Sequence, residues 1–204
     1  MKQVIETEVM TLDELNPSAK EQARKWYRSI TESDSYWSES TLDQAKEIGR
    51  LFGFDIKKIY FSGFWCQGDG ACFIGDWNSK DVKSLETIEK ELSYDKSLIQ
   101  LGKEFIESAK EFSFSHVGIA HRGHYNHSGC MRFDITLTDE EDNEIIDERF
   151  NSFEKSFTES ARDFANWIYR TLEKDYEWNQ SNECVDENIL ANEYTFTSTG
   201  KRFG

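Results

Sequence analysis

Apolar residues recur every three or four positions in several parts of the chain, which is the spacing of one face of an α-helix. This pattern predicts helices over 19–30, 42–52, 82–92, 98–109 and 153–172, and a short one at 185–191. Asn16 and Pro17 supply a cap and a first-turn proline for the first of them. The stripe over 153–172 is the most regular, so we expect a helix of about seven turns that lies across a sheet as the main core helix.

Between these helices, β-branched and aromatic runs predict four strands. They cover 56–62, 71–77, 114–121 and 131–138, and the last alternates strictly between apolar and polar residues, so one of its faces should be exposed to solvent. Short strands are also predicted near 4–9 and 194–197. No linker divides the chain. The predicted fold is therefore a single α+β domain over 1–204, with an antiparallel sheet built from two hairpins and helices packed on one side.

Composition limits the class of protein. Hydrophobic residues make up 37% of the 204 residues and the mean hydropathy is −0.72, but 14% are aromatic, so the core must depend on large rings. No run is long and apolar enough for a membrane span, and the first ten residues do not form a signal peptide. The four cysteines have no CxxC spacing. We expect a cytoplasmic protein with free thiols, and no membrane partner.

The formal charge of −15 makes direct binding to nucleic acid unlikely. The excess is concentrated over 139–193, where 17 acidic and 5 basic residues carry −12 of that charge. Two interpretations remain open for this acidic third of the chain. It is either a solvated helical surface or a mimic of the phosphate backbone that occupies a nucleic-acid groove on another protein.

The connection between the first two strands is dense in glycine and polar residues. Three glycines allow backbone N–H groups to point at an anion or a polar ligand, and an aspartate can act as acceptor, base or metal ligand. The candidate ligand- or partner-binding residues here are Ser62, Trp65, Gln67 and Asp69. The alternative is a tight bulged turn in which Asp69 caps its own backbone.

All four histidines fall between His116 and His127, around the second hairpin connection. Imidazoles spaced by three residues can converge on zinc, so His121, His124 and His127 are candidate metal ligands, completed by Asp69 or Cys72. The further candidates for ligand or partner contact are Arg122 and Tyr125. Arg122 can hold a phosphate or carboxylate, or pair with Asp134 across the hairpin. His121 shares its strand face with Val117 and Ile119 and can equally be a structural histidine.

A thiol, an imidazole base and an aspartate are also the elements of nucleophilic catalysis. The thiols near these segments are Cys66, Cys72 and Cys130, and none lies in a recognisable nucleophile motif. Whether the protein is an enzyme is therefore open, and the sequence favours a protein that is not one.

The sequence resembles a family of uncharacterised proteins from bacteria and their phages, some of which are labelled as an antitoxin of a toxin–antitoxin stability system. The similar segments are the early helix 19–27, the two hairpin connections at 61–73 and 121–130, and 167–170 in the long helix. The resemblance implies a small cytosolic protein of phage or mobile elements. It assigns no catalytic residue.

These observations favour an acidic, antitoxin-like binding protein that neutralises a toxin or a component of a host defence system, using the acidic helical surface or the aromatic hairpin loops. The alternative is a small-ligand or nucleotide-binding protein, or a metal-dependent enzyme, with its site between the two hairpin loops. That alternative requires the two loops to lie at the same end of the sheet. In a third, both segments are structural and the protein is a homo-oligomeric scaffold.

Overall fold

The computed structural model describes residues 8–31 and 36–204. Contacts between Cα atoms divide the chain into two compact units, which we describe separately. The larger unit is Ser40–Glu173, and the smaller combines the described part of Met1–Glu39 with Lys174–Gly204. Helices α2 (Tyr36–Leu51) and α5 (Glu148–Gln180) contribute residues to both units. The single domain over 1–204 stays a prediction.

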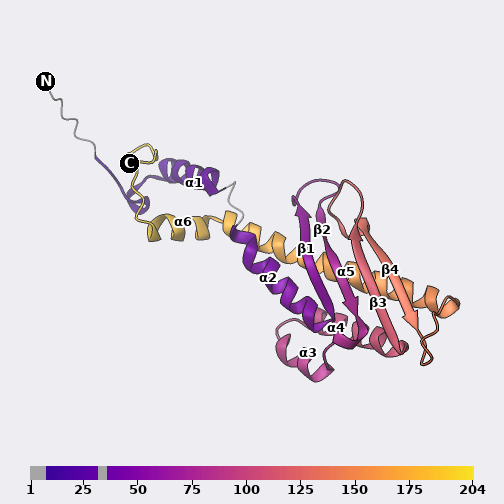
Figure 1. The fold of residues 1–204 in the computed structure, drawn as a ribbon. Helices are drawn as coiled ribbons and strands as arrows, with labels where there is room; N and C mark the ends of the chain where they lie inside the picture. Colours follow the sequence, from indigo (N-terminus) through magenta and orange to yellow (C-terminus); the bar gives the residue numbers. More distant parts are fainter. Residues whose placement is uncertain (1–7, 32–35) are drawn as a thin grey trace. The chain divides into compact units, whose positions relative to one another are not determined.

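The larger unit contains the predicted antiparallel sheet. Its four strands are β1 (Phe54–Ser62), β2 (Gly70–Asn78), β3 (Phe114–His121) and β4 (Met131–Thr138), and they lie in the order β1-β2-β3-β4. Both predicted hairpins are confirmed, and β2 joins them by pairing with β3 from Gly75↔Ile119 to Asn78↔His116. Because every neighbour is antiparallel, the β1–β2 and β3–β4 loops leave the same end of the sheet (Figure 1).

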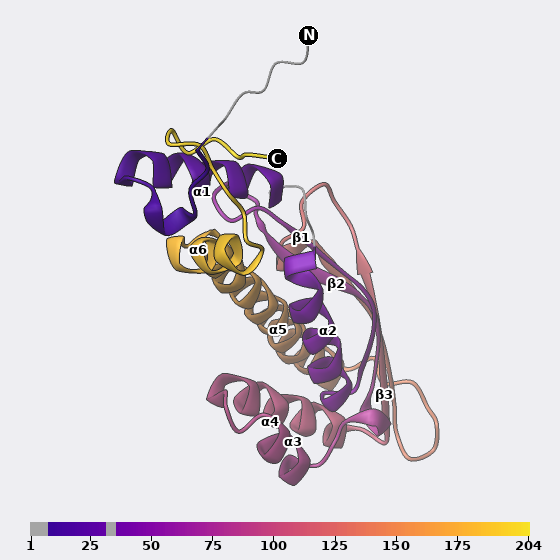
Figure 2. The ribbon, with the colours of Figure 1, turned by 90° about the vertical axis from the view of Figure 1, so that its left-hand side faces the viewer.

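The helices of the larger unit cover one face of the sheet (Figure 2). They are α2, α3 (Leu85–Glu91), α4 (Lys96–Glu111) and α5, and the 3₁₀ turn Ser79–Asp81 leads from β2 into α3. In β4, Met131, Ile135 and Leu137 are buried while alternate residues are exposed, as the sequence pattern predicts. Among the described residues of the larger unit, no helix covers the opposite face of the sheet (Figure 2). The predicted α+β class is confirmed.

Phenylalanine rings from strands and helices form the core between the sheet and α5. Phe54 of β1 lies 5.3 Å from the ring centroid of Phe73 on β2 and 5.0 Å from that of Phe105 on α4. It also packs against Phe157 and Phe164 of α5, at 6.2 and 6.0 Å. Aromatic pairs at these separations contribute about 0.5–1.5 kcal/mol beyond their buried area. Aromatic rings from the sheet, α4 and α5 thus supply the core packing that the few aliphatic residues do not.

The smaller unit packs α1 (Pro17–Thr31) against α6 (Asn182–Ala191) and the 3₁₀ turn Leu12–Glu14. Asn16 Oδ1 accepts a hydrogen bond from Ala19 N at 3.0 Å, which confirms the predicted cap. The core of this unit comprises seven buried residues: Leu12, Leu15, Ala19, Ala23, Val185, Ile189 and Phe196. Arg24 pairs with Asp186 across α1 and α6, with Nε to Oδ1 at 2.7 Å.

Three predicted elements differ from the structure in extent. The helix predicted over 153–172 runs from Glu148 to Gln180, because its flanking residues include no proline or glycine to end it. The strand predicted near 194–197 is reduced to isolated bridges of Phe196 with Met10 and Arg202. Most of the strand predicted near 4–9 lies outside the described residues.

None of the helices in the described ranges is both long enough and apolar enough to cross a lipid bilayer.

The Phe157→Ala substitution tests the aromatic core. Phe157 is fully buried and contacts Phe54, Phe105 and Trp77, the last at 4.8 Å between ring centroids. We expect the free energy of unfolding to fall by about 3–5 kcal/mol in a denaturant titration. Ile146→Ala is the control, since Ile146 is 82% exposed and its loss should cost less than about 0.5 kcal/mol. Equal effects of the two substitutions would contradict this description of the core.

Candidate functional site

The two hairpin loops lie against each other. A Cβ added to Gly68 would lie 2.7 Å from the ring of Tyr125, and one added to Gly70 would lie 2.6 Å from His127 Cα. Asn126 Nδ2 donates a hydrogen bond to the carbonyl of Phe61 at 3.2 Å, so the second loop also reaches the end of β1. Glycine is needed at 68 and 70 because the loops meet without room for a side chain. The two loops therefore lie at the same end of the sheet, as a site shared between them requires.

The first loop, residues 63–69, is held by Asp69. Its Oδ2 accepts hydrogen bonds from the backbone N–H groups of Trp65 and Cys66, at 3.0 and 2.6 Å. Tyr169 of α5 donates from its hydroxyl to the carbonyl of Gly63 at 3.2 Å. Burial raises the pKa of Tyr169, with nearby Glu173 and Asp69 adding to the shift, so the phenol stays a donor at neutral pH. Asp69 therefore caps its own turn, as the alternative interpretation of this segment expects.

Histidines organise the second loop. His121 ends β3, stacks on Tyr60 at 5.0 Å between ring centroids and donates from Nε2 to the carbonyl of Tyr125 at 2.8 Å. His127 Nδ1 accepts from Gly129 N at 3.1 Å, which caps the 3₁₀ turn Ser128–Cys130. These rings are engaged in positioning the loop backbone.

The candidate metal ligands make other contacts in the structure. Among the residues that the structure describes, no group of three or more histidine, cysteine, aspartate or glutamate side chains is placed to hold an ion. The ring nitrogen of His121 that faces the loop bonds a carbonyl, Asp69 bonds its own turn and His124 is exposed. The spacing of the histidines instead serves two separate backbone contacts.

The thiols are poorly placed for nucleophilic chemistry. Cys72 is fully buried, and burial, together with neighbouring Cys130, raises the pKa of its thiol to about 11. Cys130 is buried with its Sγ 3.7 Å from His127 Nε2. Because His127 Nδ1 already accepts a hydrogen bond, Nε2 carries the proton of the neutral ring and is not a base toward Cys130. Cys66 is exposed on the first loop.

Two large rings are exposed at this end of the sheet. Trp65 is 74% exposed on the first loop and Tyr125 is 55% exposed on the second. The remaining predicted contact residues surround them: Gln67, Arg122 and His124 are exposed, while Ser62 is half-buried at the end of β1. Within the described chain, no ion pair joins Arg122 to Asp134. The exposed rings and polar groups form one surface, which we call the loop surface.

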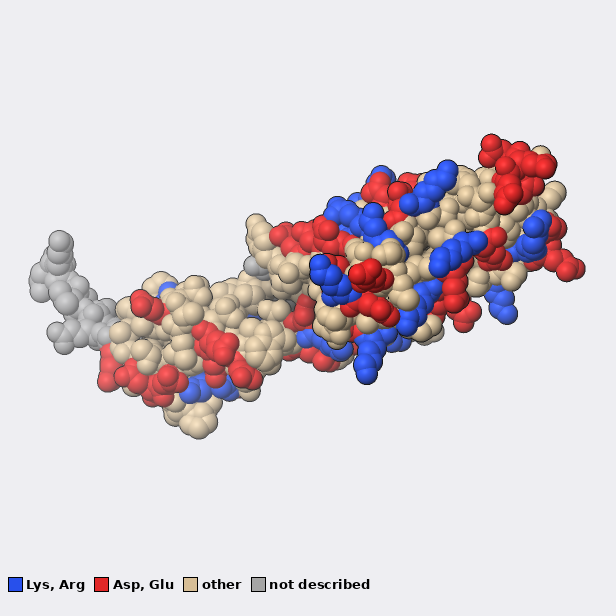
Figure 3. All heavy atoms as spheres, turned by 90° about the horizontal axis from the view of Figure 1, so that it is seen from below, with Lys and Arg blue, Asp and Glu red and all other residues tan. Residues whose placement is uncertain are grey.

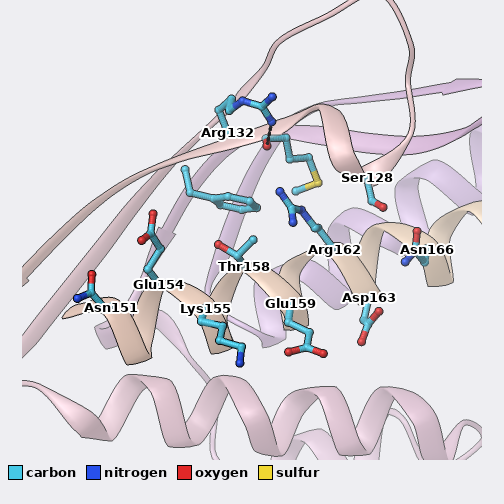
Figure 4. Close-up of a pocket in the computed structure, with 12 residues that line it drawn as sticks. Ser128, Arg132, Asn151, Glu154, Lys155, Thr158, Glu159, Arg162, Asp163 and Asn166 are labelled. Atoms are coloured by element: carbon cyan, nitrogen blue, oxygen red, sulfur yellow. Dashed lines mark hydrogen bonds between the residues drawn. The ribbon is translucent and has the colours of Figure 1, made fainter. Parts of the chain in front are cut away.

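A groove of about 790 Å³ lies between β4 and α5, and the sequence patterns did not indicate it (Figure 4). Arg162 of α5 projects into it, and its guanidinium lies 5.9 Å from the ring centroid of Phe133. The one signal in the sequence was an arginine next to the apolar stripe of the core helix, directly after Ala161. Such a position commonly holds a solvated charge, so the pattern alone does not reveal a groove.

Carboxylates line a second groove, of about 520 Å³, between α4 and α5. Glu104, Glu107 and Glu111 lie on α4, and Glu159 and Asp163 lie on α5. On the face seen in Figure 3, acidic side chains are interspersed with lysine and arginine over the larger unit. The acidic excess is therefore local rather than continuous on that face.

A family model described as a domain of unknown function, DUF8835, matches residues 37–182. The match spans more than two thirds of the chain and includes all four strands and both hairpin loops. No curated protein and no solved structure matches the chain. The family description assigns no activity, so the geometry of the loops and grooves has to carry any functional argument.

Gly70→Ala should separate the two loops. The added Cβ would overlap the backbone of His127, and that clash cannot be relieved by rotating a side chain. We expect a loss of about 1–3 kcal/mol in the free energy of unfolding, with altered NMR resonances for Tyr125 and His127. Gly118→Ala is the matched control in the same sheet, because its Cβ would lie an ordinary 3.7 Å from Asp134. Unchanged resonances in Gly70→Ala would refute the close loop contact.

Cysteine reactivity should differ between Cys66 and Cys72. At pH 8, iodoacetamide should modify exposed Cys66 while buried Cys72 stays a protonated thiol, as read by peptide mass spectrometry. Because the thiol pKa is higher in the folded chain than the ordinary 9.0, the free energy of unfolding should also fall as the pH rises from about 9 to about 11. Equal modification of both residues in the folded protein would contradict the burial of Cys72.

Proposed function

The chain belongs to the DUF8835 family, and we propose that it is a binding protein that neutralises a protein partner, as an antitoxin-like protein or an inhibitor of a host defence system. The observation that carries this proposal is the loop surface, where Trp65 and Tyr125 are exposed on two loops that contact each other. Tryptophan and tyrosine are the residues that most often supply binding energy at protein interfaces. We place the main partner contact at these two rings.

Pre-organisation supports this choice. The backbone beside Trp65 is held by Asp69, and the backbone carbonyl of Tyr125 is held by His121. The two loops also limit each other through the contact of Gly68 with Tyr125. A surface that is already ordered loses less conformational entropy when a partner binds. The polar residues of the loops thus support a binding role by positioning the rings.

An enzyme or small-ligand site between the loops is the weaker candidate. Its expected acid–base groups, Asp69, His121 and His127, are hydrogen-bonded to their own loop backbones. The buried thiol of Cys72 is held in its protonated form. The two largest grooves described here lie along α5 and not between the loops. These contacts favour recognition over catalysis.

The chemistry expected of the partner follows from charge. A chain with a formal charge of −15 attracts a basic surface and accelerates the encounter with it. Toxins and defence proteins that act on nucleic acid need basic surfaces, so they fit this requirement. The resemblance to proteins labelled as antitoxins agrees with such a partner. The groove with Glu104, Glu107 and Glu159 is the second candidate contact, and would supply electrostatic rather than aromatic recognition.

Alanine substitution of both rings tests the loop surface. A tagged protein is used to capture its partner from host lysate, and the affinity of the recovered pair is then measured with purified components. We expect Trp65→Ala combined with Tyr125→Ala to weaken binding at least 30-fold, the equivalent of about 2 kcal/mol. The two single variants are measured as well, because Tyr125→Ala also removes the ring that contacts Gly68, and a denaturant titration of each checks that the fold is retained.

Tyr94→Ala is the matched control, since Tyr94 is 61% exposed on the α3–α4 connection, at the end of the sheet away from the loops (Figure 1). It should bind as the unaltered protein does. A salt titration separates the two candidate surfaces. At about 0.5 M NaCl, screening removes most of the attraction between exposed charges, whereas aromatic contacts persist. If salt abolishes binding while the double variant still binds normally, the proposed contact at the loop surface is wrong and the acidic groove is favoured instead.

A further inference from the structure

Arg162, in the larger unit, has a shielded N–H group at Nε for which the described residues supply no hydrogen-bond acceptor. The residue as a whole is half-buried. Among the described residues, no other hydrogen bond or ion pair engages its guanidinium. A shielded N–H group of a guanidinium that lacks an acceptor is costly, which points to an acceptor that the protein itself does not supply.

The surroundings of Arg162 orient it toward the groove between β4 and α5. Its guanidinium stacks over the ring of Phe133 on β4, with 5.9 Å from Cζ to the centroid. Figure 4 shows the guanidinium directed from α5 toward β4, whereas the carboxylates of Glu159 and Asp163 leave the other side of the helix. Those two carboxylates also line the acidic groove against α4. The nearest acidic residues on the helix are therefore not its counter-ions.

The groove has a second arginine at its rim and an apolar wall, and the carboxylates of Glu154, Glu159 and Asp163 are also part of its lining. Arg132 lies at its rim, where its Nη1 donates to the carbonyls of Gly129 and Met131 at 3.0 and 2.9 Å. Those bonds hold one edge of the Arg132 guanidinium in place. Met131 and Phe133 form the apolar part of the lining, and Thr158 adds a hydroxyl group. The Arg162 guanidinium beside an aromatic ring matches an oxyanion that is attached to an apolar body.

We propose that the groove between β4 and α5 binds a small anionic molecule, whose carboxylate or phosphate group is held by Arg162. The apolar part of the ligand lies on Phe133 and Met131. The volume of about 790 Å³ is in the range of small-molecule sites, although this one is an open groove. This site is separate from the loop surface, and binding there does not depend on the proposed partner function.

NMR of the arginine Nε–Hε group tests the proposal directly, because the shielded Hε of Arg162 should give a slowly exchanging signal. The purified full-length protein is titrated with benzoate and, separately, with inorganic phosphate, at constant ionic strength set with NaCl. We expect a saturable shift of the Arg162 Hε signal and of the Thr158 amide. A response to benzoate alone assigns a carboxylate with an apolar body, and a response to phosphate alone assigns a phosphate group.

Variants decide whether the response belongs to the groove. Arg162→Gln should weaken binding at least tenfold, read from the Thr158 amide, and Arg162→Lys should weaken it less because the charge remains. Arg170→Gln is the matched control, since Arg170 is exposed on the same helix. Circular dichroism checks that each variant is folded. No saturable shift with either probe, or an equal response of the Arg162→Gln and Arg170→Gln variants, would overturn the proposal.

Discussion

The contact of Phe54 with rings from β2, α4 and α5 is the interaction on which the rest of the larger unit depends. A single side chain at the start of β1 brings together Phe73, Phe105 and Phe164, so the sheet and its helices share one set of contacts. With α5 fixed along the sheet in this way, Tyr169 reaches the first hairpin loop. The same placement of α5 creates the groove that contains Arg162. Core packing thus positions both candidate sites.

At the loop end of the sheet, the glycines and polar side chains order the loop backbone, whereas their residue types first indicate a catalytic or metal site. Gly68 and Gly70 let the loops approach, while Asp69 and His127 accept hydrogen bonds from the loop backbone. Residue types that are typical of catalytic and metal sites are used here to order two loops. The exposed rings of Trp65 and Tyr125 lie on these ordered loops, where they can contact another molecule.

The helices, the strands and the two hairpins could be predicted from the sequence. The spacing of apolar residues along each element follows which of its faces is buried, as the residues of β4 illustrate. The sequence was not sufficient for the site. The spacing of His121 and His127 is compatible with a metal ion, and only the three-dimensional path of the loop shows that each ring bonds a separate part of the backbone. Arg162 was missed for the same reason: the groove is formed by β4 and α5, and a pattern along one helix carries no information about the facing strand.

We propose the loop surface as the place where a protein partner binds. Replacing Trp65 with a photo-reactive amino acid and irradiating the protein in host lysate tests it most directly, with the same replacement at Tyr94 as the reference position. We expect a covalent adduct with one basic protein from position 65 and none from position 94. An adduct from position 94 alone, or the same adducts from both positions, would contradict it.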